Sequence, residues 1–187
     1  MDTTRRSLLT TATLGAGGLL TLASPVEAAS ARQIDSDAVR ALNRLYAAQP
    51  KARDLAKRAN AVLVFPKIYK GGLIIGGLSG DGVLRVDGKP AGYYNISAAS
   101  FGLQAGGQTY SFALFFMNEK ALKYLNDSDG WAIGSGPSVV VVDKGAAANI
   151  SSTTLTQDVY AFAFGQKGLM AGVGLEGSKI THIHPGK

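Results

Sequence analysis

The most chemically suggestive residues of this chain lie in the stretch GVGLEGSKITHIHPGK, at 172–187. Gly172, Gly174 and Gly177 have the spacing G-x-G-x-x-G, which in dinucleotide-binding proteins leads from a strand into a helix whose N-terminus holds the pyrophosphate. Here the following residues alternate like a strand, at 180–183, and then reach a proline. The pattern therefore predicts glycines that let strands curve, and no nucleotide cofactor.

The two histidines, His182 and His184, are two positions apart, so on a strand they would share a face and could chelate a metal. A stable protein site usually has three or four ligands, and the chain has no cysteine to add. The sequence therefore favours surface histidines over a metal site.

Nucleophilic catalysis finds little support in the sequence. Ser178, His182 and Asp143 could be drawn as a Ser-His-Asp triad, but almost any sequence allows such a drawing. The G-x-S-x-G motif that places a nucleophilic serine on a sharp turn is missing. We therefore predict that the protein is not an enzyme.

The N-terminal stretch, residues 1–28, is predicted to be a secretory signal peptide rather than part of the fold. It has Arg5 and Arg6 near its start, an apolar stretch from Leu8 to Ala23, and small residues at Val26 and Ala28. The paired arginines resemble a twin-arginine signal, although a plain Sec signal also fits. Residues 29–187 are then one domain, exported or periplasmic, and peripherally associated with the membrane of the cell envelope.

Two helices are expected at the start of this domain. Apolar residues recur at helical spacing over 34–49, and Pro50 suits the first turn of a second helix whose apolar face extends from Ala52 to Leu63. Basic residues gather between Arg40 and Lys70, interrupted by Asp54 alone. A basic helical face indicates either contact with a membrane surface or an ordinary solvated face. The candidate lipid-binding residues are Arg40, Arg44, Lys51, Arg53, Lys57, Arg58, Lys67 and Lys70.

The rest of the chain alternates between short apolar runs and turn residues. Asp81-Gly82 and Asp87-Gly88 are turn signals, and a short helix is expected from Asn118. The 187 residues include 24 glycines and no cysteine, so burial rather than disulfides must stabilise the fold. The pattern predicts an α+β fold, mainly an antiparallel β barrel or sandwich of many short glycine-rich strands covered by the N-terminal helices.

Five ordered motifs resemble the SYLF domain family, and together they extend over about residues 39–184. They are VLVFPKIYKGGLIIGG (62–77), GYYNISAASFGLQAGGQTYSFALFFMNEKAL (92–122), DGWAIG (129–134), SVVVVDKGA (138–146) and VYAFAFGQKGLMAGVGLEGSKITHI (159–183). In this resemblance the glycines of the C-terminal stretch belong to the last hairpin of the domain.

The resemblance implies a lipid-binding module. Eukaryotic members of the family bind phosphoinositides at membranes, and some bind actin, through a basic, amphipathic N-terminal part that corresponds here to residues 34–70. An exported bacterial protein would instead meet anionic phospholipids, and we expect no nucleic-acid partner because the basic stretch is not interleaved with aromatic residues. The alternative is a structural or protein-interaction module of the envelope without lipid specificity.

Overall fold

The computed structural model describes residues 30–72, 75–101, 106–142, 156–168 and 177–186. The predicted signal peptide and Asp143 lie outside these residues, as do Gly172 and Gly174. The chain folds into three helices and eight strands: α1 (Ala31–Ala48), α2 (Pro50–Ala56), β1 (Ala61–Gly72), β2 (Ile75–Val86), β3 (Lys89–Phe101), β4 (Gly106–Phe116), α3 (Glu119–Asp127), β5 (Trp131–Ala132), β6 (Val139–Val142), β7 (Val159–Gly168) and β8 (Lys179–Ile183).

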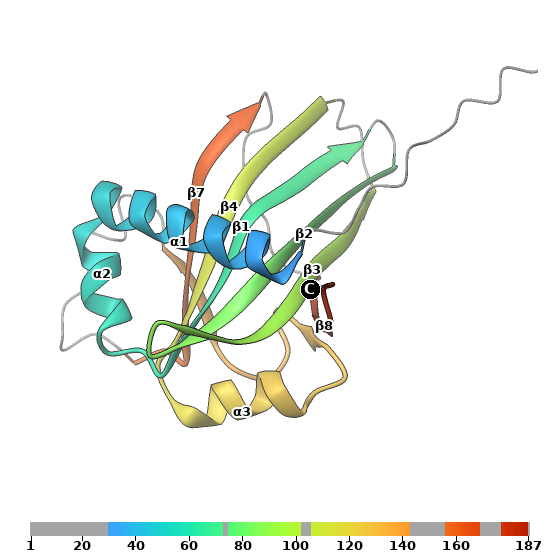
Figure 1. Ribbon diagram of the computed structural model, residues 1–187. Coiled ribbons are helices and arrows are strands. Elements are labelled where there is room, and N and C mark those ends of the chain that lie inside the picture. Colours follow the sequence, from blue (N-terminus) through green and yellow to red (C-terminus); the bar gives the residue numbers. More distant parts are fainter. Residues whose placement is uncertain (1–29, 73–74, 102–105, 143–155, 169–176, 187) are drawn as a thin grey trace, which may run out of the picture.

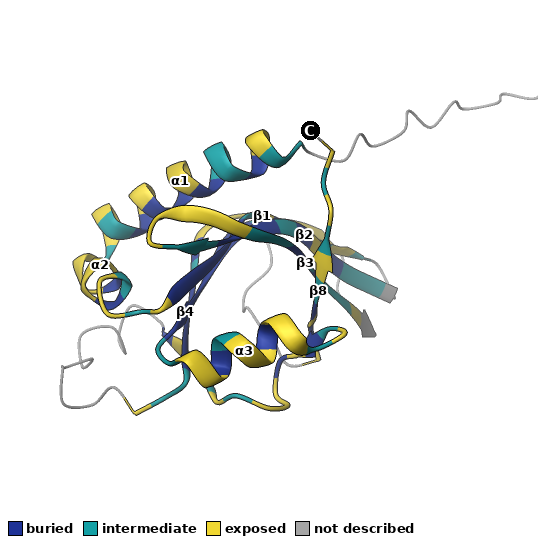
Figure 2. Cartoon of the chain, turned by 60° about the horizontal axis from the view of Figure 1, so that its bottom comes forward, coloured by how far each residue is buried: buried dark blue, intermediate teal, exposed yellow. Residues whose placement is uncertain are grey.

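The strands form one sheet in the order β5-β8-β3-β2-β1-β4-β7-β6. All neighbours are antiparallel except β6 and β7. The sheet curls into a half-barrel, with α1 and α2 against its outer face and α3 on the opposite side (Figures 1 and 2). The predicted α+β, mainly antiparallel fold with covering N-terminal helices is confirmed. In the described part of the chain the sheet remains open between β5 and β6 and has no second sheet packed on it.

Strand β1 shows how the sequence builds two cores at once. Its buried run Ala61–Phe65 alternates between the two faces of the sheet, as successive strand residues must. Leu63 and Phe65 enter the inner core, together with apolar residues of α3. Val62 and Val64 enter the outer core, together with α1 and α2.

Strand β2 is longer than predicted, because one of the two expected turns is not a turn. Asp87-Gly88 does connect β2 to β3, with φ of 49° and 74°. Asp81-Gly82 instead lies in the middle of β2, so that prediction is wrong. Glycine is required at position 82 because a side chain would clash with β1. A Cβ on Gly82 would lie 2.5 Å from the carbonyl oxygen of Val64 and 2.5 Å from the Phe65 ring.

The helix predictions agree with the structure to different degrees. The first helix begins at Ala31, before the expected stretch 34–49, and ends at Ala48. Asn118 caps α3 by accepting a hydrogen bond from the Ala121 N–H at 2.9 Å, as its sequence position indicated. Pro50 begins α2, but this helix ends at Ala56, and Leu63 is a β1 residue rather than part of a helical face. The β-branched run that starts at Ala61 pairs with β2 and β4, and this pairing ends the helical region.

The inner core also holds a buried tyrosine whose hydroxyl has no partner among the described residues. Tyr110 of β4 is 2% exposed, and burial raises the pKa of its phenol from 10.0 to about 12. Because folding favours the neutral form, this contribution to stability is complete below pH 10.0 and is lost as the pH rises towards about 12.

The Tyr110→Phe variant should therefore lose less stability above pH 10 than the unmodified protein does. At pH 7 the change should alter the free energy of unfolding by less than about 1 kcal/mol, because the hydroxyl it removes is unpaired. Urea denaturation at pH 7 and pH 11 measures both effects. Tyr124→Phe, on the exposed side of α3, is the matched control, and equal alkaline losses in both variants would contradict the assignment.

Candidate functional site

The helical cover on the outer face of the sheet carries a dense group of basic residues. Ser30 begins α1 by accepting a hydrogen bond from the Gln33 N–H at 3.3 Å. One face of α1 then packs on β1 and β2 through apolar residues such as Ala38 and Leu45, both fully buried. Figure 2 shows this buried underside and the exposed upper side of the helix. The opposite side of α1 is therefore left to solvent-facing polar residues.

Six of the eight predicted lipid-binding residues lie on this cover, and all six are exposed. They are Arg40 and Arg44 of α1, Lys51 and Arg53 of α2, and Lys57 and Arg58 directly after it. Between residues 30 and 70 the chain has nine basic residues against three aspartates. The helices thus present a positively charged surface, which we call the basic helical face.

Some of this charge is already paired. Arg40 forms an ion pair with Asp37, and the Lys57 Nζ lies 3.3 Å from an Asp54 carboxylate oxygen. Both pairs are well exposed to solvent, so each contributes little to stability and leaves its cation accessible to an anionic surface.

Tyr46 and Arg85 lie beside the basic helical face, at positions that the sequence did not indicate as part of a site. The Arg53 guanidinium lies over the Tyr46 ring, 5.7 Å from its centroid. Burial raises the pKa of Tyr46, and Arg53 and Arg85 partly offset that rise. Arg85 is mostly buried, pairs with Asp35 of α1 and donates to the carbonyl oxygen of Gly88. This ion pair ties α1 to the β2–β3 turn across 50 positions of sequence, a distance at which no local pattern predicts contact.

Lys67 and Lys70 lie on β1, and the structure separates them. Lys67 and Tyr69 are exposed on the outer face, with the Lys67 Nζ 4.7 Å from the centroid of the Tyr69 ring. Lys70 is half-buried and shares the inner face with Ile68, because side chains alternate along a strand. Lys70 therefore does not face the same side as the other seven residues.

Three residues near the helix–sheet junction, Phe65, Ile68 and Tyr69, have side chains of the kind that can insert into a membrane, but they differ in burial. Phe65 and Ile68 are fully buried in the inner core. Tyr69, in contrast, is 57% exposed. It alone of the three is accessible on the outer face.

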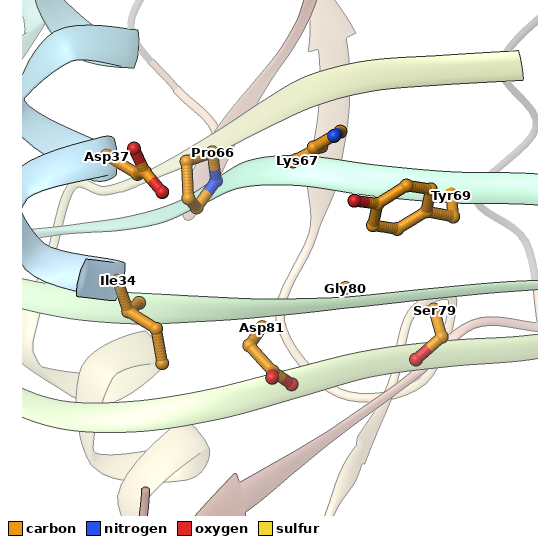
Figure 3. Close-up of a pocket in the computed structure, with 8 residues that line it drawn as sticks. All are labelled: Ile34, Asp37, Pro66, Lys67, Tyr69, Ser79, Gly80 and Asp81. Atoms are coloured by element: carbon orange, nitrogen blue, oxygen red, sulfur yellow. The ribbon is translucent and has the colours of Figure 1, made fainter. Parts of the chain in front are cut away.

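A pocket of about 380 Å³ opens beside Tyr69, between the N-terminal half of α1 and the strands β1 and β2 (Figure 3). A bulge of β1 contributes to its wall: one extra residue lies between Phe65 and Ile68, relative to β4. The Ser111 hydroxyl holds this bulge by donating to the carbonyl oxygen of Pro66 at 2.7 Å. The lining residues are Ile34, Asp37, Pro66, Lys67, Tyr69, Ser79, Gly80 and Asp81.

The other candidate residues do not assemble into a reaction centre in the described structure. Ser178 is buried, whereas His182 is exposed. His182 and His184 lie side by side, with ring centroids 4.8 Å apart, and the described residues contain no group of three or more metal-ligating side chains around them. Gly177, with φ of 79°, precedes the strand β8 rather than a helix, as the alternation at 180–183 predicted.

The described helices differ from membrane-spanning ones. None of them is both long enough and apolar enough to cross a bilayer.

The curled sheet, its charged helical cover and the open pocket beside Tyr69 together form the candidate site. Residues 97–184 match the family model Ysc84, described as Las17-binding protein actin regulator. Ysc84 is the family model of the SYLF domain, so the resemblance predicted from the motifs is confirmed over residues 97–184. The family consists of domains that bind lipids and regulators of actin. A comparison with curated proteins found no match to the chain.

The matched segment begins within β3 and therefore follows α1, α2, β1 and β2. All eight predicted lipid-binding residues precede it, so their role stays a prediction.

The sequence did not indicate Ser79 and Asp81 as pocket residues. Asp81 was interpreted as part of a turn, and only the pairing of β2 with β1 brings it beside Lys67 and Tyr69.

Proposed function

We propose that this protein is a non-catalytic domain that binds anionic phospholipid surfaces in the bacterial cell envelope through its basic helical face. The observation that carries the proposal is the set of six exposed cations on α1, on α2 and directly after α2, on the outside of the half-barrel. Each cation near an anionic membrane surface contributes about 1 kcal/mol. Four or five acting together are enough to hold a protein of this size at a membrane.

The envelope location follows from the predicted signal peptide at residues 1–28. In that compartment the accessible anionic ligands are phospholipid headgroups. Actin and phosphoinositides are not expected there, so the protein would use a lipid-binding property of its family on a different membrane.

Co-sedimentation with vesicles tests the proposal. The protein should bind vesicles that contain phosphatidylglycerol, should not bind pure phosphatidylcholine, and should be released as salt rises from about 0.01 to 1 M, because the Debye length falls from about 30 to 3 Å. Binding that ignores both lipid charge and salt would contradict a role for the basic helical face.

A protein partner in the envelope is a second candidate, favoured by the sheet edge at β6. Val140 and Val141 of this edge strand are 37% and 45% exposed. Edge strands with apolar side chains offer a template for pairing with another chain. Failure to bind any vesicle would favour this candidate over the first.

A further inference from the structure

The pocket beside Tyr69 contains a carboxylate that attraction to anionic lipids does not explain. Asp81 lines it from β2 and Asp37 lines it from α1, whereas Lys67 is the one cation of the lining. A purely anionic headgroup placed there would be repelled by this carboxylate. The pocket therefore fits a ligand that carries a positive group as well as a negative one.

The Asp81 carboxylate is held in position and can accept further hydrogen bonds. The Asn95 amide donates to its Oδ1 at 2.7 Å and to the Ser79 Oγ at 3.2 Å, so one side chain of β3 orients both acceptors. Among the described residues nothing else bonds to the Asp81 carboxylate. Asp37 differs, because Gln33 and Arg40 already use both of its oxygens. Asp81 and Ser79 are thus the acceptors available to an incoming N–H donor.

The opposite wall supplies an aromatic face and a cation. Tyr69 pairs with Ser79 across β1 and β2, and its ring borders the same pocket (Figure 3). Lys67, exposed and placed over that ring, brings a positive charge to the pocket. Gly80 lines the pocket between the two acceptors; a Cβ there would lie 2.6 Å from the Lys67 carbonyl oxygen, so the residue must stay small for the bulge to form.

We infer that this pocket binds the phosphoethanolamine headgroup of a phospholipid. The primary ammonium donates hydrogen bonds to Asp81 and Ser79 beside the Tyr69 ring, and the phosphate lies against Lys67. A choline headgroup has no N–H to donate, and quaternary ammonium groups are usually held by several aromatic rings, of which this pocket has one. The inference rests on the proposed function: the basic helical face brings the domain to the membrane, and the pocket selects the headgroup.

The test compares vesicles with equal phosphatidylglycerol content in a background of either phosphatidylethanolamine or phosphatidylcholine. The full chain should bind the ethanolamine vesicles about three to ten times more tightly, the range that the net contribution of an ordinary hydrogen bond gives. Asp81→Asn should abolish this preference without weakening binding to the choline vesicles. Asp127→Asn makes the same charge change on α3 and should keep the preference, which separates the pocket from general effects of charge and bilayer packing.

The outcomes separate the two proposals. Equal binding to both vesicles, or a preference that survives in Asp81→Asn, overturns the inference and leaves the proposed function intact. Binding to neither vesicle overturns the proposed function. Titration with soluble O-phosphoethanolamine, followed by the amide resonances of Ser79 and Gly80, then decides the pocket alone: shifts that Asp81→Asn removes support it, and unchanged resonances overturn it.

Discussion

Reversal of four cations on the basic helical face, Lys51, Arg53, Lys57 and Arg58 to glutamate, should reduce binding to phosphatidylglycerol vesicles by about 100-fold or more. Each cation contributes about 1 kcal/mol near an anionic surface, and each glutamate adds repulsion. Salt screening reduces the sum, which is why the expected loss is smaller than simple addition gives. Co-sedimentation at low salt measures the ratio of the two partition constants.

The variant should remain folded, because all four side chains are exposed. The contacts it loses, such as the exposed pair of Lys57 with Asp54, contribute at most about 1 kcal/mol each. The matched control reverses four exposed lysines that lie outside α1 and α2: Lys120, Lys123, Lys167 and Lys179. Equal losses of binding in the two variants would mean that net charge, and not the basic helical face, directs the protein to the membrane.

Local signals predicted those parts of the fold whose causes are local. Asn118 caps a helix through its own side chain, Pro50 begins one with its fixed φ, and Asp87-Gly88 forms a turn because both residues adopt positive φ. Each of these depends on a few neighbouring residues. The sequence therefore indicated them correctly.

The errors occurred where long-range pairing decides the structure. Asp81-Gly82 has the composition of a turn, but β2 pairs with both β1 and β3 along its length, and the packing of Phe65 against Gly82 requires a glycine inside the strand. The short strands expected from the glycine spacing are for this reason segments of longer ones. Gly82 is needed here because β1 and β2 approach each other closely, whereas the sequence alone suggested a turn.

The same distinction applies to the candidate site. The basic helical face is contiguous in sequence and could be recognised as a cluster of cations. The pocket joins α1 to a bulge of β1 and to the middle of β2, and its acceptors are oriented by Asn95 of β3. A bulge shifts the strand register by one residue, and the periodicity of the sequence does not indicate where such a shift occurs. Ser79 and Asp81 could therefore be found only in three dimensions.

The largest loss of stability should come from Trp131, the single tryptophan of the chain. It is 1% exposed, its Nε1 donates to the Ser135 carbonyl oxygen at 2.8 Å, and its ring lies 5.9 Å from that of Phe116. Trp131 also pairs with Ile180, so it attaches β8 and the two-residue strand β5 to the inner core. Trp131→Ala should lower the free energy of unfolding by about 3–5 kcal/mol, the range for truncating a fully buried aromatic residue.

Trp131→Phe is the graded control, because it keeps an aromatic ring but removes the hydrogen bond to Ser135. It should lower the free energy of unfolding clearly less than the alanine variant does, and urea denaturation followed by far-UV circular dichroism measures both.

Trp131 lies in the inner core, and the basic helical face covers the outer one. Folded protein of either variant should consequently bind phosphatidylglycerol vesicles as the unmodified chain does. A loss below about 1 kcal/mol for Trp131→Ala would show that β5 and β8 are not held by the inner core, whereas weakened vesicle binding by folded variants would show that the two faces of the sheet are coupled.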